Sequence, residues 1–272
     1  MIVPPKPAST VILIRPDLKI LLMRRSQKAS FFPSAWVFPG GRVDDDDKKV
    51  PCYGHIDGLV ENEFAVAAIR ETFEEAGIWF GLGEATEELR IGLNNRTQTL
   101  ADAPHLQANL DRMELWSWWI TPENEPKRYD TRFFICALTT EEAQRTQIDN
   151  NEMVEYQWLT AQDVLEQHAQ QKLPLAPPTF VTISEIFDQN PKSTTELLKF
   201  ASKRLVDVIV PQHQKRIVEH QQCLEIIFPS HPNHKNPKPN TYLKSTSVFF
   251  YEQQWHWSES TSKSMSKSKN AP

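Results

Sequence analysis

Three glutamates within five residues are the strongest sign of chemistry in this sequence. Glu71, Glu74 and Glu75 are spaced i, i+3 and i+4, so on a helix their carboxylates share one face. Like charges this close repel one another, and a cation bound between them removes the repulsion. Clustered carboxylate oxygens suit Mg²⁺ or Mn²⁺, which keep several waters and bridge to phosphate oxygens. The spacing therefore indicates a metal-assisted reaction at a diphosphate.

Arg70 belongs to the same group of candidate catalytic residues. It lies next to Glu71 and four residues before Glu74, within reach of a charge-assisted hydrogen bond that would orient a carboxylate. The alternative is a solvated helix face with ordinary i, i+4 ion pairs, the usual meaning of such a charge run. The full pattern R-E-x-x-E-E-x-G favours function, because chance would produce it in roughly one chain of this length in a few thousand.

A helix and a glycine loop are expected to position these side chains. Residues 63–76 are rich in helix formers, carry apolar residues at helical spacing on the other face, and are followed by Gly77, a suitable helix-ending residue. Pro39-Gly40-Gly41 follows a short strand predicted over 35–38. Two glycines let the backbone approach a ligand closely, so we place Gly40 and Gly41 at the substrate.

The segment from Arg70 to Ile78 resembles the second half of the Nudix box, G-x5-E-x7-R-E-U-x-E-E-x-G-U, in which U is a bulky apolar residue. The FPGG sequence that ends at Gly41 resembles its first half. Between the halves, residues 42–61 are expected to form an irregular insertion, which leaves Asn62 at the position of the upstream Glu. This replacement would remove a metal ligand or an orienting contact without changing the fold. The run Asp44–Asp47 is expected to be a solvated loop.

A long insertion inside the box resembles the coenzyme A diphosphatase subgroup of animal peroxisomes and its bacterial relatives. The resemblance covers about residues 9–211. It implies an α/β (α+β) fold, a Nudix-type α/β/α sandwich with a mixed sheet. It also implies Mg²⁺ or Mn²⁺ held by Glu71, Glu74 and Glu75, and hydrolysis of coenzyme A or acyl-coenzyme A.

Other charged residues are candidates for contact with the substrate. Arg24 and Arg25 end a predicted strand near the site, and because strand residues alternate in direction, at most one of them should face it. Arg132, flanked by aromatic residues, either lines the pocket and binds substrate or forms a structural ion pair. Glu152 and Glu155 lie where some relatives of the family place an extra catalytic carboxylate.

The remaining pattern predicts strands and helices in mixed order, as in α/β and α+β folds. Strands are expected at 9–14, 19–23, 115–120, 131–138 and 154–158, and helices after Thr160 and from Pro177 to about 204. Trp116, Trp118 and Trp119 in one of these strands are expected to serve core packing. We divide the chain into a Nudix domain over 1–204, an extension over 205–257 with short strands at 205–210, 223–228 and 248–251, and a disordered polar tail over 258–272.

The composition excludes several classes of function. The formal net charge of −5 over 272 residues provides no broad basic surface, which disfavours nucleic acid as the main partner. No stretch approaches the roughly 18 apolar residues of a membrane helix. The three cysteines are far apart, which fits a reducing compartment, so we expect a cytoplasmic protein.

The leading hypothesis is a metal-dependent hydrolase that cleaves the phosphoanhydride of a small nucleoside diphosphate-linked molecule, with coenzyme A or acyl-coenzyme A as the substrate. A homodimer is compatible with the sequence. A second hypothesis keeps the chemistry but exchanges the substrate for ADP-ribose, NADH, a dinucleotide or a nucleotide sugar. A third is a Nudix-fold ligand sensor without activity. The retention of all three glutamates argues against the third.

Overall fold

Most of the described chain is organised around one mixed sheet, whose strands are β1 (Lys6–Ile14), β2 (Ile20–Arg25), β3 (Trp36–Val37), β4 (Gly40–Arg42), β7 (Met113–Ile120), β8 (Tyr129–Ala137), β9 (Met153–Leu159) and β10 (Val208–Ile209). The structure is a computed structural model that describes residues 2–29, 32–56, 60–148, 152–238, 243 and 245–258. The strand order is β10-β7-β8-β1-β2-β3, with β4 beside β1 and β9 beside β2. β1 runs parallel to β8 and antiparallel to β2 and β4.

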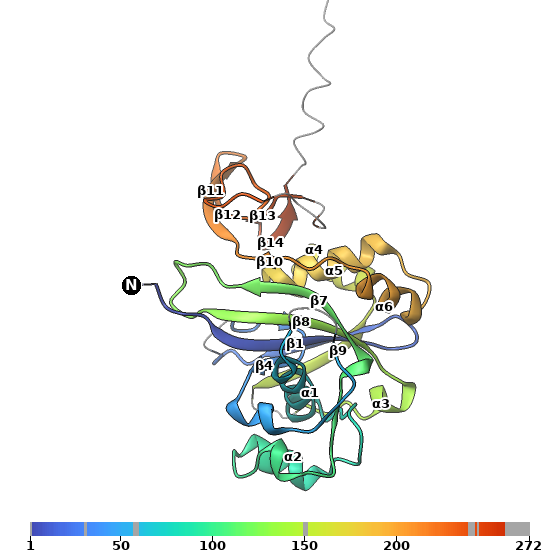
Figure 1. Cartoon of the computed structure of the whole chain (residues 1–272). Coiled ribbons are helices and arrows are strands. Elements are labelled where there is room, and N and C mark those ends of the chain that lie inside the picture. The colour runs from blue at the N-terminus through green and yellow to red at the C-terminus, as the bar shows by residue number, and fades with distance from the viewer. Residues whose placement is uncertain are drawn as a thin grey trace, which may run out of the picture.

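Helices cover both faces of this sheet (Figure 1). α1 (Asn62–Ala76) and α2 (Glu87–Asn94) lie on one side, and α4 (Ala161–Ala169), α5 (Pro177–Gln189) and α6 (Thr194–Ser202) lie on the other, while the short α3 (Thr140–Gln144) follows β8. The continuous apolar run of β1 is consequently buried on both faces. Val11 and Leu13 belong to the core that contains α1, and Ile12 and Ile14 to the core that contains α5. The expected α/β/α sandwich with a mixed sheet is confirmed.

α1 agrees closely with the helix predicted over 63–76, because amphipathic periodicity and a terminal glycine are both local signals. It begins one residue earlier, at Asn62, and ends at Gly77, which has a φ of 68° and donates its N–H to the carbonyl of Phe73 at 3.0 Å. α1 packs against β1 and β4, and its apolar residues share a core with Val11 and Leu13 of β1. No helix in the described part of the chain is long and apolar enough to cross a bilayer.

The segment between the glycine strand β4 and α1 folds back onto α1. It contains the 3-10 helix η1 (Asp45–Lys49), which packs against α1. It continues into β5 (Cys52–Tyr53), which pairs in parallel with β6 (Ala108–Asn109). Two further 3-10 helices, η2 (Leu100–Asp102) and η3 (Leu110–Arg112), flank β6. Residues 57–59 of the predicted insertion lie outside the described residues.

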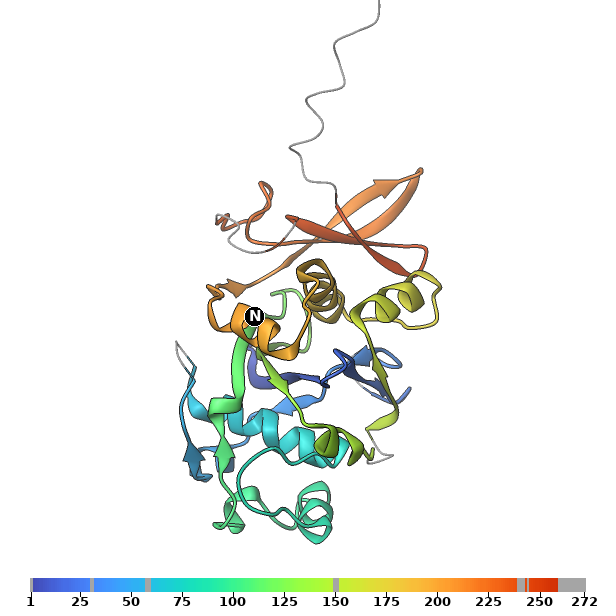
Figure 2. The same ribbon diagram turned by 90° about the vertical axis from the view of Figure 1, so that its right-hand side faces the viewer.

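A second sheet lies above α4 and α5 in Figures 1 and 2. Its strands are β11 (Gln212–Val218), β12 (Gln221–Ile227), β13 (Ser247–Tyr251) and β14 (Gln254–Trp257), antiparallel and adjacent in that order. β10, β12 and β13 correspond to the strands predicted for the extension, whereas β11 and β14 were not predicted. The predicted tail, apart from Ser258, lies outside the described residues.

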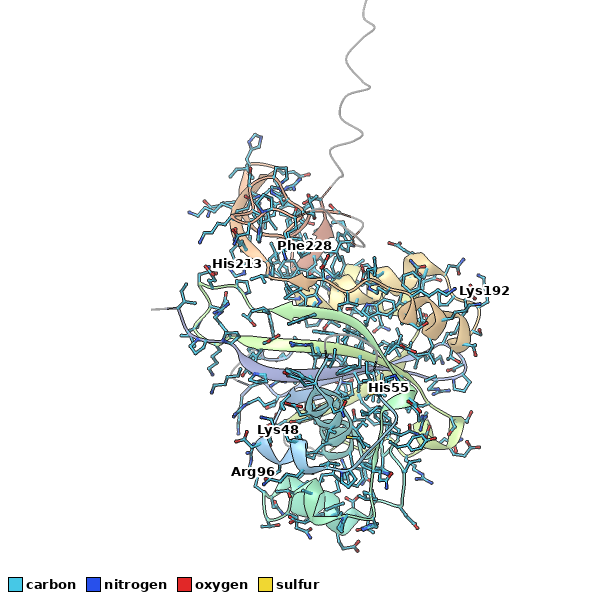
Figure 3. All side chains as sticks on the ribbon, in the orientation of Figure 1. Lys48, His55, Arg96, Lys192, His213 and Phe228 are labelled. Carbon is cyan, nitrogen blue, oxygen red and sulfur yellow. The ribbon has the colours of Figure 1, made fainter. Side chains whose placement is uncertain are left out.

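The two faces of this C-terminal sheet differ in polarity. Cross-strand register places Ile226 opposite Val248, and Val248 opposite Trp257, so these apolar residues share one face. This face packs on the body of the protein, where Phe228 lies edge-on to the ring of Trp119 at 5.8 Å. Figure 3 shows Phe228 and His213 on the part of the C-terminal segment that approaches the main sheet. The sheet therefore extends the core that lies between the main sheet and α5.

His168 of α4 anchors β14 to the body of the protein. Its Nδ1 donates to the carbonyl of Leu173 at 2.9 Å, and its Nε2 accepts the backbone N–H of Trp255 at 2.9 Å. The ring must be neutral to do both, because a protonated imidazole has no acceptor nitrogen. Burial lowers the pKa of His168 below its ordinary value of 6.5, so the neutral form is the stable one.

We expect acid to weaken this anchor. Because the pKa is lowered on folding, the unfolded chain binds the proton more readily, and the stabilisation by His168 is present above about pH 6.5 and lost as the pH falls below it. Thermal unfolding between about pH 8 and about pH 5 should show a steeper loss of Tm for the wild type than for His168→Gln, whose amide can donate and accept without titrating. Equal slopes would contradict the role of His168.

Candidate active site

A cleft of about 1210 Å³ brings together segments that are far apart in the sequence. It is lined by α1, by the N-terminal part of β1, by β4 and η1, by the connection between β7 and β8, by the start of α5, and by the C-terminal sheet. The sequence-predicted site residues that line it are Arg25, Gly40, Gly41, Arg70, Glu71, Glu74 and Glu75. These residues therefore come together on one surface.

β4 fits against the glutamate side of α1 because glycine has no side chain. The N–H of Gly40 donates to Oε2 of Glu75 at 3.0 Å. A Cβ on Gly40 would lie 2.3 Å from the carbonyl oxygen of Ser9, and one on Gly41 would lie 2.4 Å from the carboxyl carbon of Glu71. Gly41 therefore lies beside the third turn of α1, where Glu71 is.

The guanidinium of Arg70 connects the carboxylates of this site. Its Nη1 donates to Oε1 of Glu71 at 3.0 Å and to Oε1 of Glu74 at 2.9 Å. Its Nε and Nη2 donate to the two carboxylate oxygens of Asp47 at 2.8 and 3.0 Å, and Nη2 also donates to the carbonyl of Arg42 at 2.8 Å. All five N–H donors of the side chain are thus used within the protein. Arg70 thus holds the side chains of Glu71 and Glu74 in place, and its part in catalysis stays a prediction.

Asp47 corrects the interpretation of the insertion. We expected the run of aspartates to be solvated and Asn62 to occupy the upstream carboxylate position of the box. Asp47 is instead 2% exposed and forms the two-point ion pair with Arg70. Residues 42–46, five in number, separate it from Gly41, which is the G-x5-E spacing with Asp in place of Glu. The additional residues therefore follow Asp47, and Asn62 lies at the start of α1, away from the glutamates.

Burial dominates the electrostatics of the three glutamates. It raises the pKa of Glu71 to about 7, against the opposing effect of Arg70. It also raises the pKa of Glu74, and it raises that of Glu75 well above the ordinary value, to which the charge of Glu71 adds. Burial alone would lower the pKa of Arg70, but its hydrogen bond to Asp47 and the neighbouring carboxylates raise it, so the guanidinium stays charged. The site carries more negative charge than Arg70 alone offsets.

The donor set fits a hard divalent cation. One oxygen of each glutamate accepts a hydrogen bond from Arg70 or Gly40, while the second accepts none from the residues that the structure describes. In those residues, no three His, Cys, Asp or Glu side chains are arranged as a formed metal centre. Oxygen chemistry and unbalanced negative charge suit Mg²⁺ or Mn²⁺ at Glu71, Glu74 and Glu75. The metal itself stays a prediction.

The structure separates the remaining charged candidates. Arg25 lines the cleft, whereas Arg24 forms an ion pair with Glu155 at 3.2 Å, as expected for alternating strand residues. Glu152 lines the cleft, and its charge contributes to the raised pKa of the Glu75 carboxyl. The assignment of substrate binding to Arg24 has no support from its position.

Arg132 also lies outside the cleft lining, which corrects its assignment to substrate binding. Its guanidinium carbon lies 3.6 Å from the ring centre of Trp118 and 4.2 Å from that of Phe64, and Nη1 pairs with Asp130. Arg132 therefore stacks on two aromatic rings and forms an ion pair with Asp130. This is the structural role that we gave as the alternative to substrate binding.

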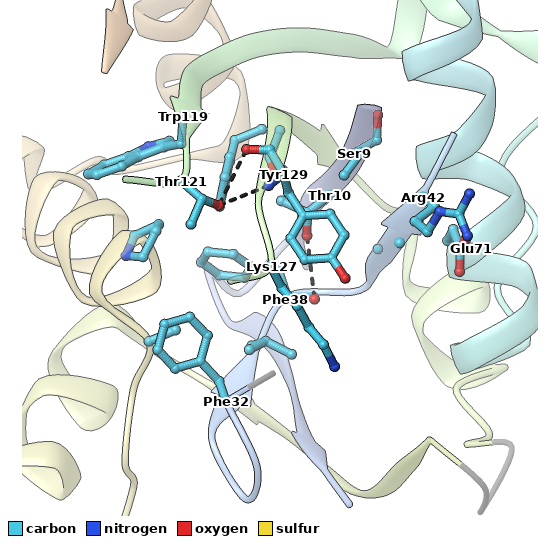
Figure 4. Close-up of a pocket in the computed structure, with 18 of the residues that line it drawn as sticks. Ser9, Thr10, Phe32, Phe38, Arg42, Glu71, Trp119, Thr121, Lys127 and Tyr129 are labelled. Atoms are coloured by element: carbon cyan, nitrogen blue, oxygen red, sulfur yellow. Dashed lines mark hydrogen bonds between the residues drawn. The ribbon is translucent and has the colours of Figure 1, made fainter. Parts of the chain in front are cut away.

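Several residues that line the cleft were not predicted to do so. Lys127 and Tyr129 lie between Glu71 and Trp119 in the view of Figure 4. Trp119, expected in the core, is 5% exposed and also lines the cleft. His213 and three residues of β12 and β14 line it from the C-terminal sheet: Leu224, Ile226 and Trp255. The sequence shows that apolar residues alternate along these strands. It does not show which surface of the protein their apolar face would contact.

We expect the Asp47–Arg70 pair to matter for stability. Asp47→Ala leaves a buried guanidinium without its main partner, so it should lower the free energy of unfolding by about 3–5 kcal/mol. Asp46→Ala is the matched control, because the side chain of Asp46 is partly exposed and pairs with Lys49, and its loss should cost about 0–1 kcal/mol. Urea unfolding of the two variants measures the difference. Equal costs would contradict the role given to Asp47.

Comparison with known sequences is consistent with this geometry. The family model described as NUDT19 Nudix domain matches residues 55–186, which include Arg70 and the three glutamates. The acyl-coenzyme A diphosphatase NUDT19 of Xenopus laevis is 28% identical, with 70% of this chain and 65% of that protein covered. The putative nudix hydrolase 7 of Caenorhabditis elegans is 27% identical, with 66% and 59% covered. The chain thus spans less than two thirds of the length of these relatives.

Comparison with solved structures concerns the fold. A Nudix hydrolase from Alicyclobacillus acidocaldarius superposes with a TM-score of 0.62 at 22% identity, covering 76% of this chain and 99% of that one. At this identity the likeness shows a shared fold. The matched sequence region also carries the box helix with its glutamates in place, so the chain is similar to Nudix hydrolases in both sequence and fold.

Proposed function

We propose that this protein is a Mg²⁺- or Mn²⁺-dependent hydrolase that cleaves the diphosphate of coenzyme A or acyl-coenzyme A. The observation that carries the proposal is the placement of Glu71, Glu74 and Glu75 against the glycine strand inside one cleft. Oxygen donors, backbone contact and a cleft of about 1210 Å³ are the components that a diphosphate-cleaving site requires.

Some residues of the cleft would position the carboxylates, and others would supply charge to the phosphate groups of the substrate. Arg70 fixes Glu71 and Glu74, and the N–H of Gly40 fixes Glu75, so the carboxylates are oriented before the substrate arrives. Arg25 at the cleft wall supplies a positive charge for phosphate oxygens. A bound divalent cation would neutralise the diphosphate and lower the pKa of the attacking water.

The proposal that the substrate is coenzyme A or its acyl form rests on similarity to named relatives, and the size of the cleft supports it. Three of the relatives are named acyl-coenzyme A diphosphatases, from Xenopus laevis, Gallus gallus and Homo sapiens, and they are 27–28% identical to this chain. The cleft exceeds the roughly 300–1,000 Å³ of ordinary small-molecule sites, so it has room for a substrate longer than a nucleotide.

We keep the cytoplasm as the proposed location, supported by three free cysteine thiols. The homodimer stays a prediction.

A product-resolved hydrolysis screen tests the proposal. Coenzyme A, acyl-coenzyme A, ADP-ribose, NADH, a diadenosine polyphosphate and a nucleotide sugar are each incubated with Mg²⁺, with Mn²⁺ or with EDTA. We expect 3′-phosphorylated AMP from the coenzyme A substrates, no product in EDTA, and recovery when metal is added back. Full activity in chelator would refute metal dependence. Hydrolysis of other diphosphates in place of coenzyme A would refute the substrate.

Glutamine variants of the three glutamates separate catalysis from folding. Glu71→Gln, Glu74→Gln and Glu75→Gln keep the size of the side chain but remove its charge, so kcat should fall by on the order of 10² or more in at least two of them. Glu63→Gln is the control on the same helix, since Glu63 pairs with Lys48 outside the cleft. Near wild-type rates in all three variants would mean that the glutamates are only a solvated face.

The same variants should not destabilise the metal-free protein. Because folding raises the pKa of each carboxyl, the stability that these groups contribute is full below about pH 4.5 and declines as the pH rises through the folded-state pKa, about 7 for Glu71. Glutamine carries no titratable proton, so the variant does not lose stability in this way as the pH rises. In EDTA near pH 8 the Tm of Glu75→Gln should therefore equal or exceed that of the wild type.

A further inference from the structure

The cleft has a polar end and an apolar end. At the polar end, Glu71 lies close to Arg42 in Figure 4. At the opposite side of the same view are the rings of Trp119 and Phe32. Lys127 lies between the two ends. A molecule that places a diphosphate at the glutamates therefore has space beyond it that is lined by apolar groups.

The C-terminal sheet supplies part of this apolar end. Leu224 and Ile226 are two residues apart on β12, so their side chains share one face, and Trp255 reaches the cleft from β14. Ile226 is 5% exposed, whereas Leu224 on the same face remains 42% exposed. The sheet thus turns a partly open apolar surface toward the substrate space.

This wall is preformed. Trp255 is held by its backbone N–H on His168 and by its Nε1, which donates to the carbonyl of Leu175 at 3.0 Å. On the other side, Nε1 of Trp119 donates to the hydroxyl of Ser117 at 3.1 Å, and its ring packs edge-on against Phe228. Rings fixed in this way lose little freedom when an apolar group binds between them.

We propose that the apolar end of the cleft binds a hydrocarbon chain carried by the substrate, and that Leu224, Ile226 and Trp255 of the C-terminal sheet select for it. The inference rests on the proposed function, because the chain would be the acyl group attached beyond the diphosphate of coenzyme A. A chain that enters this end leaves water for apolar contact, and each buried methylene should raise affinity by about 4-fold.

Binding without turnover provides the test. Wild type and Leu224→Ser are titrated in EDTA with coenzyme A and with decanoyl-coenzyme A below its micelle concentration, and tryptophan fluorescence reports on the cleft. The wild type should bind the decanoyl form at least about 10-fold more tightly than coenzyme A. Leu224→Ser should reduce the ratio of the two affinities by about 5-fold, because it removes apolar contact at an already exposed position.

Leu205→Ser is the matched control. Leu205 is 79% exposed and lies outside the cleft lining, so this variant should keep the wild-type ratio. Equal affinities of the wild type for the two ligands, or an unchanged ratio in Leu224→Ser, would overturn the inference. If the ratio behaves as expected but neither ligand is hydrolysed with Mg²⁺ or Mn²⁺, the proposed function fails and the apolar site stands.

Discussion

The buried guanidinium of Arg70 is the interaction on which the candidate active site depends. It joins two segments of the box, because the same planar group holds Asp47 of η1 on one edge and Glu71 and Glu74 of its own helix on another. A lysine could not reproduce this arrangement, since it lacks the forked donors. The position of η1 on α1 and the orientation of Glu71 and Glu74 both depend on this one side chain.

Local signals explain why much of the fold was predictable. The helix with its glycine end, the strand before FPGG and the two-sided strand β1 are each encoded by residues within a few positions of one another. The upstream carboxylate was misassigned to Asn62 because the insertion was counted back from the helix. Counting forward from Gly41 reaches Asp47 at the box spacing, but only the ion pair with Arg70 distinguishes it from its three neighbouring aspartates.

Long-range contacts explain what was missed. β11 reads QHQKRIV, which is polar and shows no alternation of apolar residues, and it exists as a strand because β12 pairs with it. The contribution of β12 and β14 to the cleft depends on their docking against α4 and α5 through residues such as His168. Sequence periodicity predicts that a strand has an apolar face, but not which distant surface that face will meet.

The two parts of the cleft are synthesised at different times, because they lie in different parts of the sequence. A chain that has left the ribosome only as far as α6 already contains Arg70, its carboxylate partners and the glycine strand, because all of them precede Thr194. The apolar wall formed by β12 and β14 comes last, and until it docks, Trp119 lacks its contact with Phe228. Protein segments fold broadly in the order in which they are made, so we expect the residues that could cleave to be synthesised and placed before those that would restrict what enters.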